Sequence, residues 1–121
     1  DYLFLSERSR IHWWMYWLTY GSVYRSALAA LGVEKLVRPF RIRNDGPDKF
    51  RGAFWGKWFT ALLLASTYTP TSALEDQLRY GVEEMMRTQT DDGCIATYPD
   101  DVQHGHWDTW SRKYVLLGLI N

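Results

Sequence analysis

The sequence predicts an all-α fold of about four helices. Apolar residues recur near helical spacing in four stretches, and segments rich in Gly, Pro, Asn and Asp separate these stretches. One of the stretches is apolar nearly all the way round, whereas the next is apolar on one face only. Such an alternation of inner and outer helices is typical of an α/α barrel, and it also fits an ordinary helical bundle.

The first helix is expected from about Ser6, as its N-cap, to Leu31, with Gly32 at its C-terminal end. Residues 11–33 are long enough to span a bilayer. Polar residues interrupt that stretch, among them Arg25, and a charge near the middle of a membrane is costly. We therefore expect an aromatic-rich helix in water here, and no contact with a membrane.

Residues 33–52 are expected to form a connector, because Pro39, Pro47 and the turn-forming residues 44–46 work against regular structure. The second helix is expected over residues 53–68, where Lys57 is the only charged residue. A helix that is apolar all round must be covered on most of its sides.

The third helix is expected to begin at Ser72, which forms a Ser-x-x-Glu capping box with Glu75. Turns follow over residues 90–105, around a short extended segment at residues 94–98. The fourth helix is expected to begin near Asp108. The apolar stripe of the third helix consists of Leu74, Leu78, Val82, Met85 and Met86, and its charged residues lie mostly off this stripe.

Composition limits the class of protein. A chain of 121 residues fits one small domain, and an apolar share of 46% is that of a globular protein. The 14 basic and 14 acidic residues cancel, which argues against attraction to nucleic acid or anionic lipid. The aromatic share of 17% fits either a large core or flat surfaces on which a sugar stacks.

Three acidic pairs bear on catalysis: Glu83–Glu84, Asp91–Asp92 and Asp100–Asp101. Glycoside hydrolysis needs two carboxyl groups that face each other across the scissile bond. Adjacent residues on a helix point in different directions, and the aspartate pairs lie beside Gly93 and Pro99, where turn formation explains them. We expect all three pairs on solvated turns and helix faces, and we predict no catalytic residue in this chain.

His104 and His106 could ligate a metal, with Asp101 or Cys94 as a further ligand. The His-x-His spacing alone is common in loops by chance, so we expect no metal site. Cys94 is the only cysteine, and the sequence identifies no base that would activate it as a nucleophile. We expect an inert, partly buried thiol.

Residues 38–51 carry five basic residues interleaved with Phe40 and Phe50. This pattern fits contacts with single-stranded nucleic acid, and it also fits guanidinium groups that hold the hydroxyls or carboxylates of a sugar. Nearby acidic residues offset much of the charge, so a solvated connector with both phenylalanines in the core is favoured over either.

Two clusters of aromatic and charged residues lie at the starts of the second and fourth helices. Tryptophan rings are planes on which the apolar face of a sugar stacks, and charged side chains bind its hydroxyls. Asp108 also suits a helix N-cap, and the tryptophans also suit simple packing. The candidate sugar-binding residues are Arg41, Trp55, Lys57, Trp107, Asp108, Trp110 and Arg112.

The order of four segments carries a family resemblance. LVRPFRIR, GAFWGKWFTALLLASTYTP, LRYGVEEMMRTQTDDGCIATY and WDTWSRKYVLLGL follow one another between about Val33 and Leu119. In this order they resemble the N-terminal part of glycoside hydrolase family 127 and its relatives, whose known activity is that of β-L-arabinofuranosidases, whereas residues 1–32 match poorly. The resemblance implies a catalytic (α/α)6 barrel, of which these helices are the first few.

The resemblance also implies that the catalytic residues of the family lie outside the segments matched here. In the family, a zinc-bound cysteine nucleophile with Cys and Glu ligands and a glutamate acid/base all lie far downstream of the matching region. Cys94 stands where relatives usually have an aromatic or other apolar residue, so it does not inherit the nucleophile's role, and we expect no zinc in this chain. Better-known members have a histidine near the position of Arg112, which leaves the identity of the sugar open.

These observations lead to one hypothesis and one alternative. The hypothesis is that residues 1–121 are a single N-terminal fragment of the barrel and form one wall of a pocket for L-arabinofuranoside-type or related plant polysaccharide sugars. The fragment is then expected to be inactive alone, and to self-associate through exposed apolar helix faces. The alternative is a small non-catalytic helical module that binds a sugar or another protein and closes its own core. Nucleic acid is not expected as a partner.

Overall fold

In the computed structural model, residues 31–121 are described, and all of their regular structure is helical. This confirms the all-α class, while membership of an (α/α)6 barrel stays a prediction. The helix expected from Ser6 lies outside the described residues, as does most of the stretch 11–33. The elements are α2 (Val33–Ile42), α3 (Gly52–Tyr68), α4 (Ser72–Met86), the 3-10 turn η1 (Asp100–Val102) and α5 (Asp108–Ile120).

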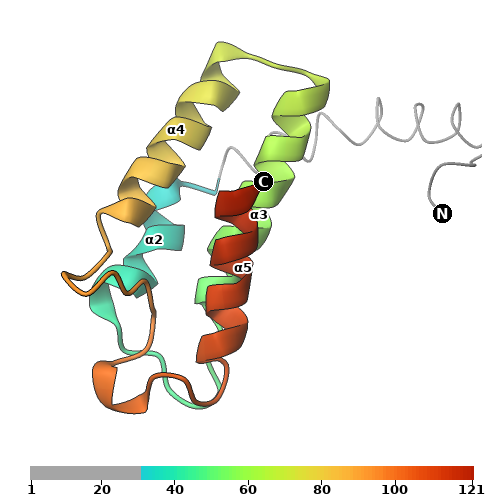
Figure 1. The fold of residues 1–121 in the computed structure, drawn as a ribbon. Coiled ribbons are helices and arrows are strands. Elements are labelled where there is room, and N and C mark those ends of the chain that lie inside the picture. The colour runs from blue at the N-terminus through green and yellow to red at the C-terminus, as the bar shows by residue number, and fades with distance from the viewer. Residues whose placement is uncertain (1–30) are drawn as a thin grey trace, which may run out of the picture.

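Consecutive helices run in opposite directions, so that α3 and α5 begin at the end of the molecule where α2 and α4 finish (Figure 1). The connections over residues 43–51 and 87–107 lie at this same end, which we call the loop end. No helix in the described part of the chain is long and apolar enough to cross a membrane.

Helix α2 corrects the expectation that residues 33–52 form a connector without regular structure. Its residues Val33, Val37 and Phe40 lie on one face and are buried in the core. Burying such side chains contributes about 1.5–3 kcal/mol each, whereas a proline inside a helix costs about 3 kcal/mol. The packing of this face therefore outweighs the effect of Pro39, which lies inside the helix.

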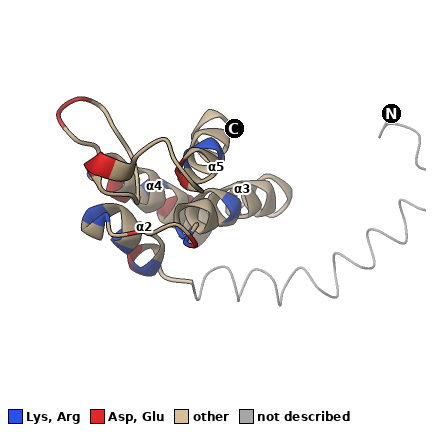
Figure 2. Cartoon of the chain, turned by 90° about the horizontal axis from the view of Figure 1, so that it is seen from below, with Lys and Arg blue, Asp and Glu red and all other residues tan. Residues whose placement is uncertain are grey.

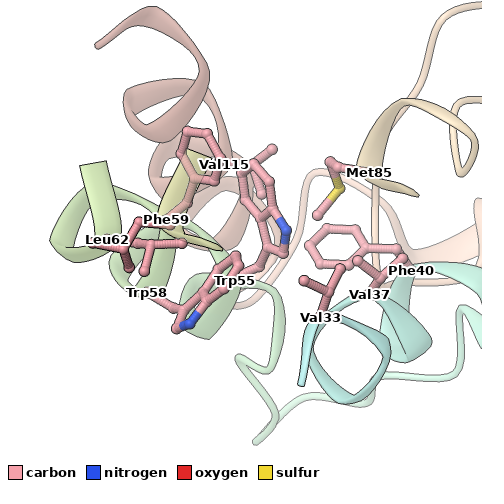
Figure 3. Packing of buried hydrophobic residues seen from close by; sticks show 10 residues of the cluster. Val33, Val37, Phe40, Trp55, Trp58, Phe59, Leu62, Met85 and Val115 are labelled. Carbon is pink, nitrogen blue, oxygen red and sulfur yellow. The ribbon is translucent and has the colours of Figure 1, made fainter. Parts of the chain in front are cut away.

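Helix α3 forms as expected and is the centre of the core. Its side chains contact helices on several sides, and Trp55 stacks on Phe59 with ring centroids 4.9 Å apart and planes 11° apart. Figure 3 shows these rings between residues of α2, α4 and α5. The buried apolar cluster consists of Val33, Val37, Phe40, Trp55, Trp58, Phe59, Leu62, Leu74, Met85 and Val115.

The N-terminus of α4 differs from the predicted capping box. Thr71, not Ser72, is the N-cap: its backbone is extended, and its Oγ1 accepts a hydrogen bond from the backbone N–H of Leu74 at 3.3 Å. Glu75 therefore lies four residues after the cap, one position too late for the reciprocal bond of a capping box. Within the predicted apolar stripe, Leu74 is buried whereas Met86 is exposed.

Helix α5 begins at Asp108, as expected, and lies against α3 along its length. The part of the chain that the structure describes leaves large apolar side chains of these two helices exposed to solvent. This is the kind of surface expected for a barrel fragment, and self-association through it stays a prediction. The side chains are Leu64 and Tyr68 of α3 and Leu116, Leu117 and Ile120 of α5.

The two helices approach each other most closely at Gly56. A Cβ atom at this position would lie 2.0 Å from the carbonyl oxygen of Tyr114 and 2.8 Å from the backbone nitrogen of Val115. Gly118 faces the same contact, since its own Cβ would lie 3.6 Å from the Cα of Gly56. Only glycine permits backbones to come this close.

Gly56→Ala is therefore expected to lower the free energy of unfolding by at least about 2 kcal/mol, because forced separation of α3 and α5 outweighs the roughly 1 kcal/mol by which alanine favours a helix. Urea denaturation followed by circular dichroism measures the change. Gly46→Ala is the matched control: a Cβ there meets nothing within 4 Å. It is expected to change stability by less than about 0.5 kcal/mol. Equal stabilities of the two variants would contradict the packing described here.

Candidate functional site

Polar side chains concentrate at the loop end of the molecule. The segment 94–98, expected to be extended, contains no strand; it is an irregular loop whose residues 96–98 are buried. Tyr98 anchors this loop, since its hydroxyl lies 2.9 Å from the carbonyl oxygen of Gly46 and 2.5 Å from that of Lys49. Burial raises the pKa of Tyr98 above its ordinary value of 10.0. The two connections at the loop end are thereby joined.

Asp108 is fully buried and does not act as the N-cap of α5, a position held by Trp107. Its Oδ2 accepts hydrogen bonds from the backbone N–H of His104 at 2.8 Å and from Nε of Arg112 at 2.9 Å. The backbone of His104 has a positive φ of 65°, which is uncommon for a residue other than glycine. Asp108 thus fixes both the loop that precedes α5 and a guanidinium group on the first turns of this helix.

Arg112 is held from three sides and remains partly exposed, with 26% of its side-chain surface open to solvent. Besides Asp108, its guanidinium contacts Oε1 of Gln103 at 2.9 Å and Sγ of Cys94 at 3.3 Å. Burial alone would lower the pKa of Arg112, but the hydrogen bond and the charge of Asp108 raise it overall. The arginine is therefore a fixed cation with its planar donor group already oriented.

Cys94 contacts a second guanidinium group, because Nη2 of Arg43 lies 3.9 Å from its sulfur. Arg43 in turn pairs with Asp100 at 2.6 Å. Among residues 31–121 no group of three or more His, Cys, Asp or Glu side chains is placed to hold a metal ion. The zinc of the family enzymes does not fit here, because arginines rather than carboxylates or further thiols surround this cysteine.

Arg41 lies in the contact between α2 and α4. It pairs with Glu34 at 2.6 Å and with Glu84, which also pairs with Arg87. Glu84 was expected on a solvated helix face, but it is 5% exposed because two arginines neutralise it there. The hydrogen bond from Arg41, followed by that from Tyr80, lowers the pKa of Glu34. The other five members of the acidic pairs are exposed, as expected.

The structure separates the two candidate residues of α3. Trp55 has no exposed surface and belongs to the core. Lys57 is exposed, and its Nζ lies 4.7 Å from the centroid of the Tyr114 ring on α5. Of these two residues, only Lys57 is accessible to a ligand in the part of the chain that the structure describes.

A continuous series of rings runs along the surface near the starts of α3 and α5. Neighbouring centroids lie 5.6, 6.0, 6.0 and 5.2 Å apart along the series. The last three contacts are edge to face, so that consecutive rings point in different directions. We call this series the aromatic strip; in order, it consists of Phe54, Phe50, Trp107, Trp110 and Tyr114.

The aromatic strip is open to solvent: Trp107 and Trp110 are 46% and 40% exposed, and both phenylalanines are exposed to a similar degree. Phe50 was expected in the core with Phe40, but only Phe40 is buried. Sequence reasoning thus missed Phe50, Phe54 and Tyr114 as part of a surface. For Tyr114 the sequence did contain a signal, because Tyr114 lies four residues after Trp110, and residues four apart are neighbours on the surface of a helix.

Of the seven candidate residues, the structure brings Trp107, Trp110 and Lys57 together at the aromatic strip. Asp108 and Arg112 lie in the same turns of α5 and fix its polar side. Arg41 and Trp55 are occupied by structural contacts within the described part of the chain.

Comparisons of the chain with protein-family models, with curated proteins and with solved structures gave no match.

Asp108→Asn is expected to lower the free energy of unfolding by about 2 kcal/mol, because the partly buried Arg112 loses the charge that offsets its burial while an acceptor oxygen remains. Urea denaturation at neutral pH measures the effect. Asp76→Asn, on the exposed side of α4, is the control and is expected to change stability by less than about 0.5 kcal/mol. A loss no larger than that of the control would show that the buried pair is not structural.

Tyr98→Phe is expected to lower the free energy of unfolding by about 1 kcal/mol, since the carbonyl oxygens of Gly46 and Lys49 lose their donor. The pKa of Tyr98 is higher in the folded chain than in the unfolded chain, so its contribution is complete below pH 10.0 and is lost as the pH rises above it. The variant is therefore expected to lose less stability than the wild type between neutral and alkaline pH. Parallel pH profiles for the two proteins would contradict this role.

Proposed function

We propose that this chain forms one wall of the sugar-binding site of a glycoside hydrolase that resembles family 127 and acts on L-arabinofuranoside-type or related plant polysaccharide sugars. The sequence support is the order of four matching segments between about Val33 and Leu119. The structural observation that carries the proposal is the aromatic strip, whose tryptophans and phenylalanines are exposed.

The aromatic strip has the properties that sugar binding requires. Sugar rings bury the apolar faces formed by their C–H groups against aromatic side chains, and each such contact contributes through apolar burial and ring electrostatics. Trp107 and Trp110 offer large exposed rings at the start of α5, and their edge-to-face contact holds them in place. A pre-positioned surface loses little conformational entropy when a ligand binds.

Arg112 projects from the side of α5 opposite Trp110 and Tyr114, so in this proposal it contacts a different part of the sugar chain from the aromatic strip. Its contacts with Asp108, Gln103 and Cys94 set the direction of the guanidinium group, and part of the side chain stays open to solvent. Donors that are already fixed in this way lose little side-chain conformational entropy when they form hydrogen bonds with sugar hydroxyls. In the proposal the arginine binds and orients the sugar, and no bond-breaking step is assigned to any residue of this chain.

The exposed apolar residues of α3 and α5 are, in this proposal, covered by further helices of a barrel. Leu116, Leu117 and Ile120 lie on α5 beyond the aromatic strip, and they are all exposed. Solvent-exposed patches of this kind mark surfaces that pack against another part of a protein. The alternative, a non-catalytic helical module, uses the same aromatic strip for sugar binding and needs no further helices.

The test is binding of a linear arabinotriose to the 121-residue chain, followed by NMR of the tryptophan indole N–H signals. The signals of Trp107 and Trp110 are expected to shift on titration. Trp110→Ala is expected to weaken binding roughly fivefold, since ring contacts of this kind contribute about 1 kcal/mol. Tyr68→Ala removes an exposed ring at the opposite end of α3 and is the matched control, with unchanged affinity.

Equal affinities of Trp110→Ala and the wild type would contradict the assignment of the sugar site to the aromatic strip. Absence of any shift in the wild type would contradict the proposed function itself. Circular dichroism of both variants shows whether the fold is retained, as expected for substitutions of exposed side chains.

A further inference from the structure

Two lysines converge on the aromatic strip from different helices. Nζ of Lys113 lies 3.7 Å from the centroid of the Trp110 ring and 4.6 Å from that of Tyr114. Nζ of Lys57, on α3, lies 4.7 Å from the same Tyr114 ring. Contacts of a cation with a ring contribute roughly 0.5–1 kcal/mol at exposed sites, which is enough to favour one position of a flexible lysine. Both ammonium groups are therefore held over the ring of Tyr114.

Neither lysine pairs with a carboxylate within residues 31–121, where the ion pairs all use arginine. Asp108, the only acidic residue of α3 and α5, is neutralised by Arg112. These two helices thus carry three basic residues and one acidic residue, although the whole chain has a formal charge of zero. Figure 2, which views the molecule from the loop end, shows basic residues on α3 and α5 and acidic residues on the connection between α4 and α5.

Two ammonium groups beside one ring repel each other, and a single anion between them converts this repulsion into two attractions. The rings next to them favour a ligand with an apolar face. A ligand that satisfies both conditions is a sugar ring that carries a carboxylate. A neutral sugar uses the rings but leaves the two charges unpaired.

We propose that the aromatic strip binds an acidic sugar, a uronate residue of a plant-type polysaccharide, with its carboxylate between Lys57 and Lys113 and its ring against Trp110. This inference rests on the proposed function and adds the substrate class to it. It assigns a specificity to the chain that distinguishes charged from neutral sugars.

The experiment compares a galacturonate trisaccharide with the neutral galactose trisaccharide, both titrated into the 121-residue chain and followed by NMR of the indole signals. The acidic probe is expected to bind about fivefold more tightly at low salt, the size of effect that two exposed charge contacts produce. Raising the NaCl concentration from about 0.05 to about 0.5 M is expected to remove most of the difference.

Lys57→Gln combined with Lys113→Gln is expected to abolish the preference, so that the acidic and the neutral trisaccharide bind this variant with equal affinity. Lys35→Gln is the matched control, because Lys35 is an exposed lysine on α2, away from the aromatic strip. It is expected to keep the full preference. Circular dichroism confirms the fold of each variant.

Equal affinities for the two trisaccharides would overturn the inference, and so would a preference that survives in the double lysine variant. If arabinotriose binds while the acidic probe shows no advantage, the inference fails and the proposed function stands; if none of the sugars binds, both fail. Tighter binding of a single-stranded oligonucleotide than of the acidic probe would also overturn it. The inference would also be overturned if the chain formed a dimer on size-exclusion chromatography and Trp110→Ala converted it to a monomer, because the aromatic strip would then bind a second copy of the chain.

Discussion

The close packing of α3 against α5 is the constraint on which the rest of the molecule depends. It requires glycine at position 56, where the backbone of one helix meets the carbonyl of Tyr114 on the other. This contact sets how α3 and α5 lie against each other, and both helices begin at the loop end (Figure 1). The arrangement places Lys57 beside the Tyr114 ring and brings Phe54, through Phe50, into contact with Trp107. The surface that we assign to sugar binding thus follows from a packing constraint in the core.

The loop end combines a fixed polar interior with an open aromatic exterior. Asp108 lies at the junction: it is buried, holds the preceding loop and orients Arg112, while the neighbouring Trp107 points its ring to solvent. Burying a carboxylate is costly unless a cation and further donors offset the cost, and here Arg112 and the backbone N–H of His104 both bind Oδ2, while Oδ1 is buried without a partner among the described residues. A site built in this way keeps its side chains in place before any ligand arrives.

The sequence predicted α3 and α5 well because their own residues determine them: continuous apolar character for α3, and an acidic start followed by apolar residues for α5. It failed where distant contacts decide. Helix α2 forms despite Pro39 because its apolar face is buried by other helices. Glu84 is buried where Arg41 of α2 and Arg87, the C-cap of α4, both pair with it. The aromatic strip was predicted only in part, since the contact of Phe50 with Trp107 joins segments far apart in the sequence.

The aromatic strip forms because α3 packs closely against α5, and NMR distance restraints can detect this packing in solution. We expect a strong nuclear Overhauser effect between the Hα protons of Gly56 and the backbone N–H of Val115. We also expect effects between the side-chain methylene protons of Lys57 and the ring protons of Tyr114. Absence of these effects in a folded chain, with other contacts of α3 intact, would contradict the account.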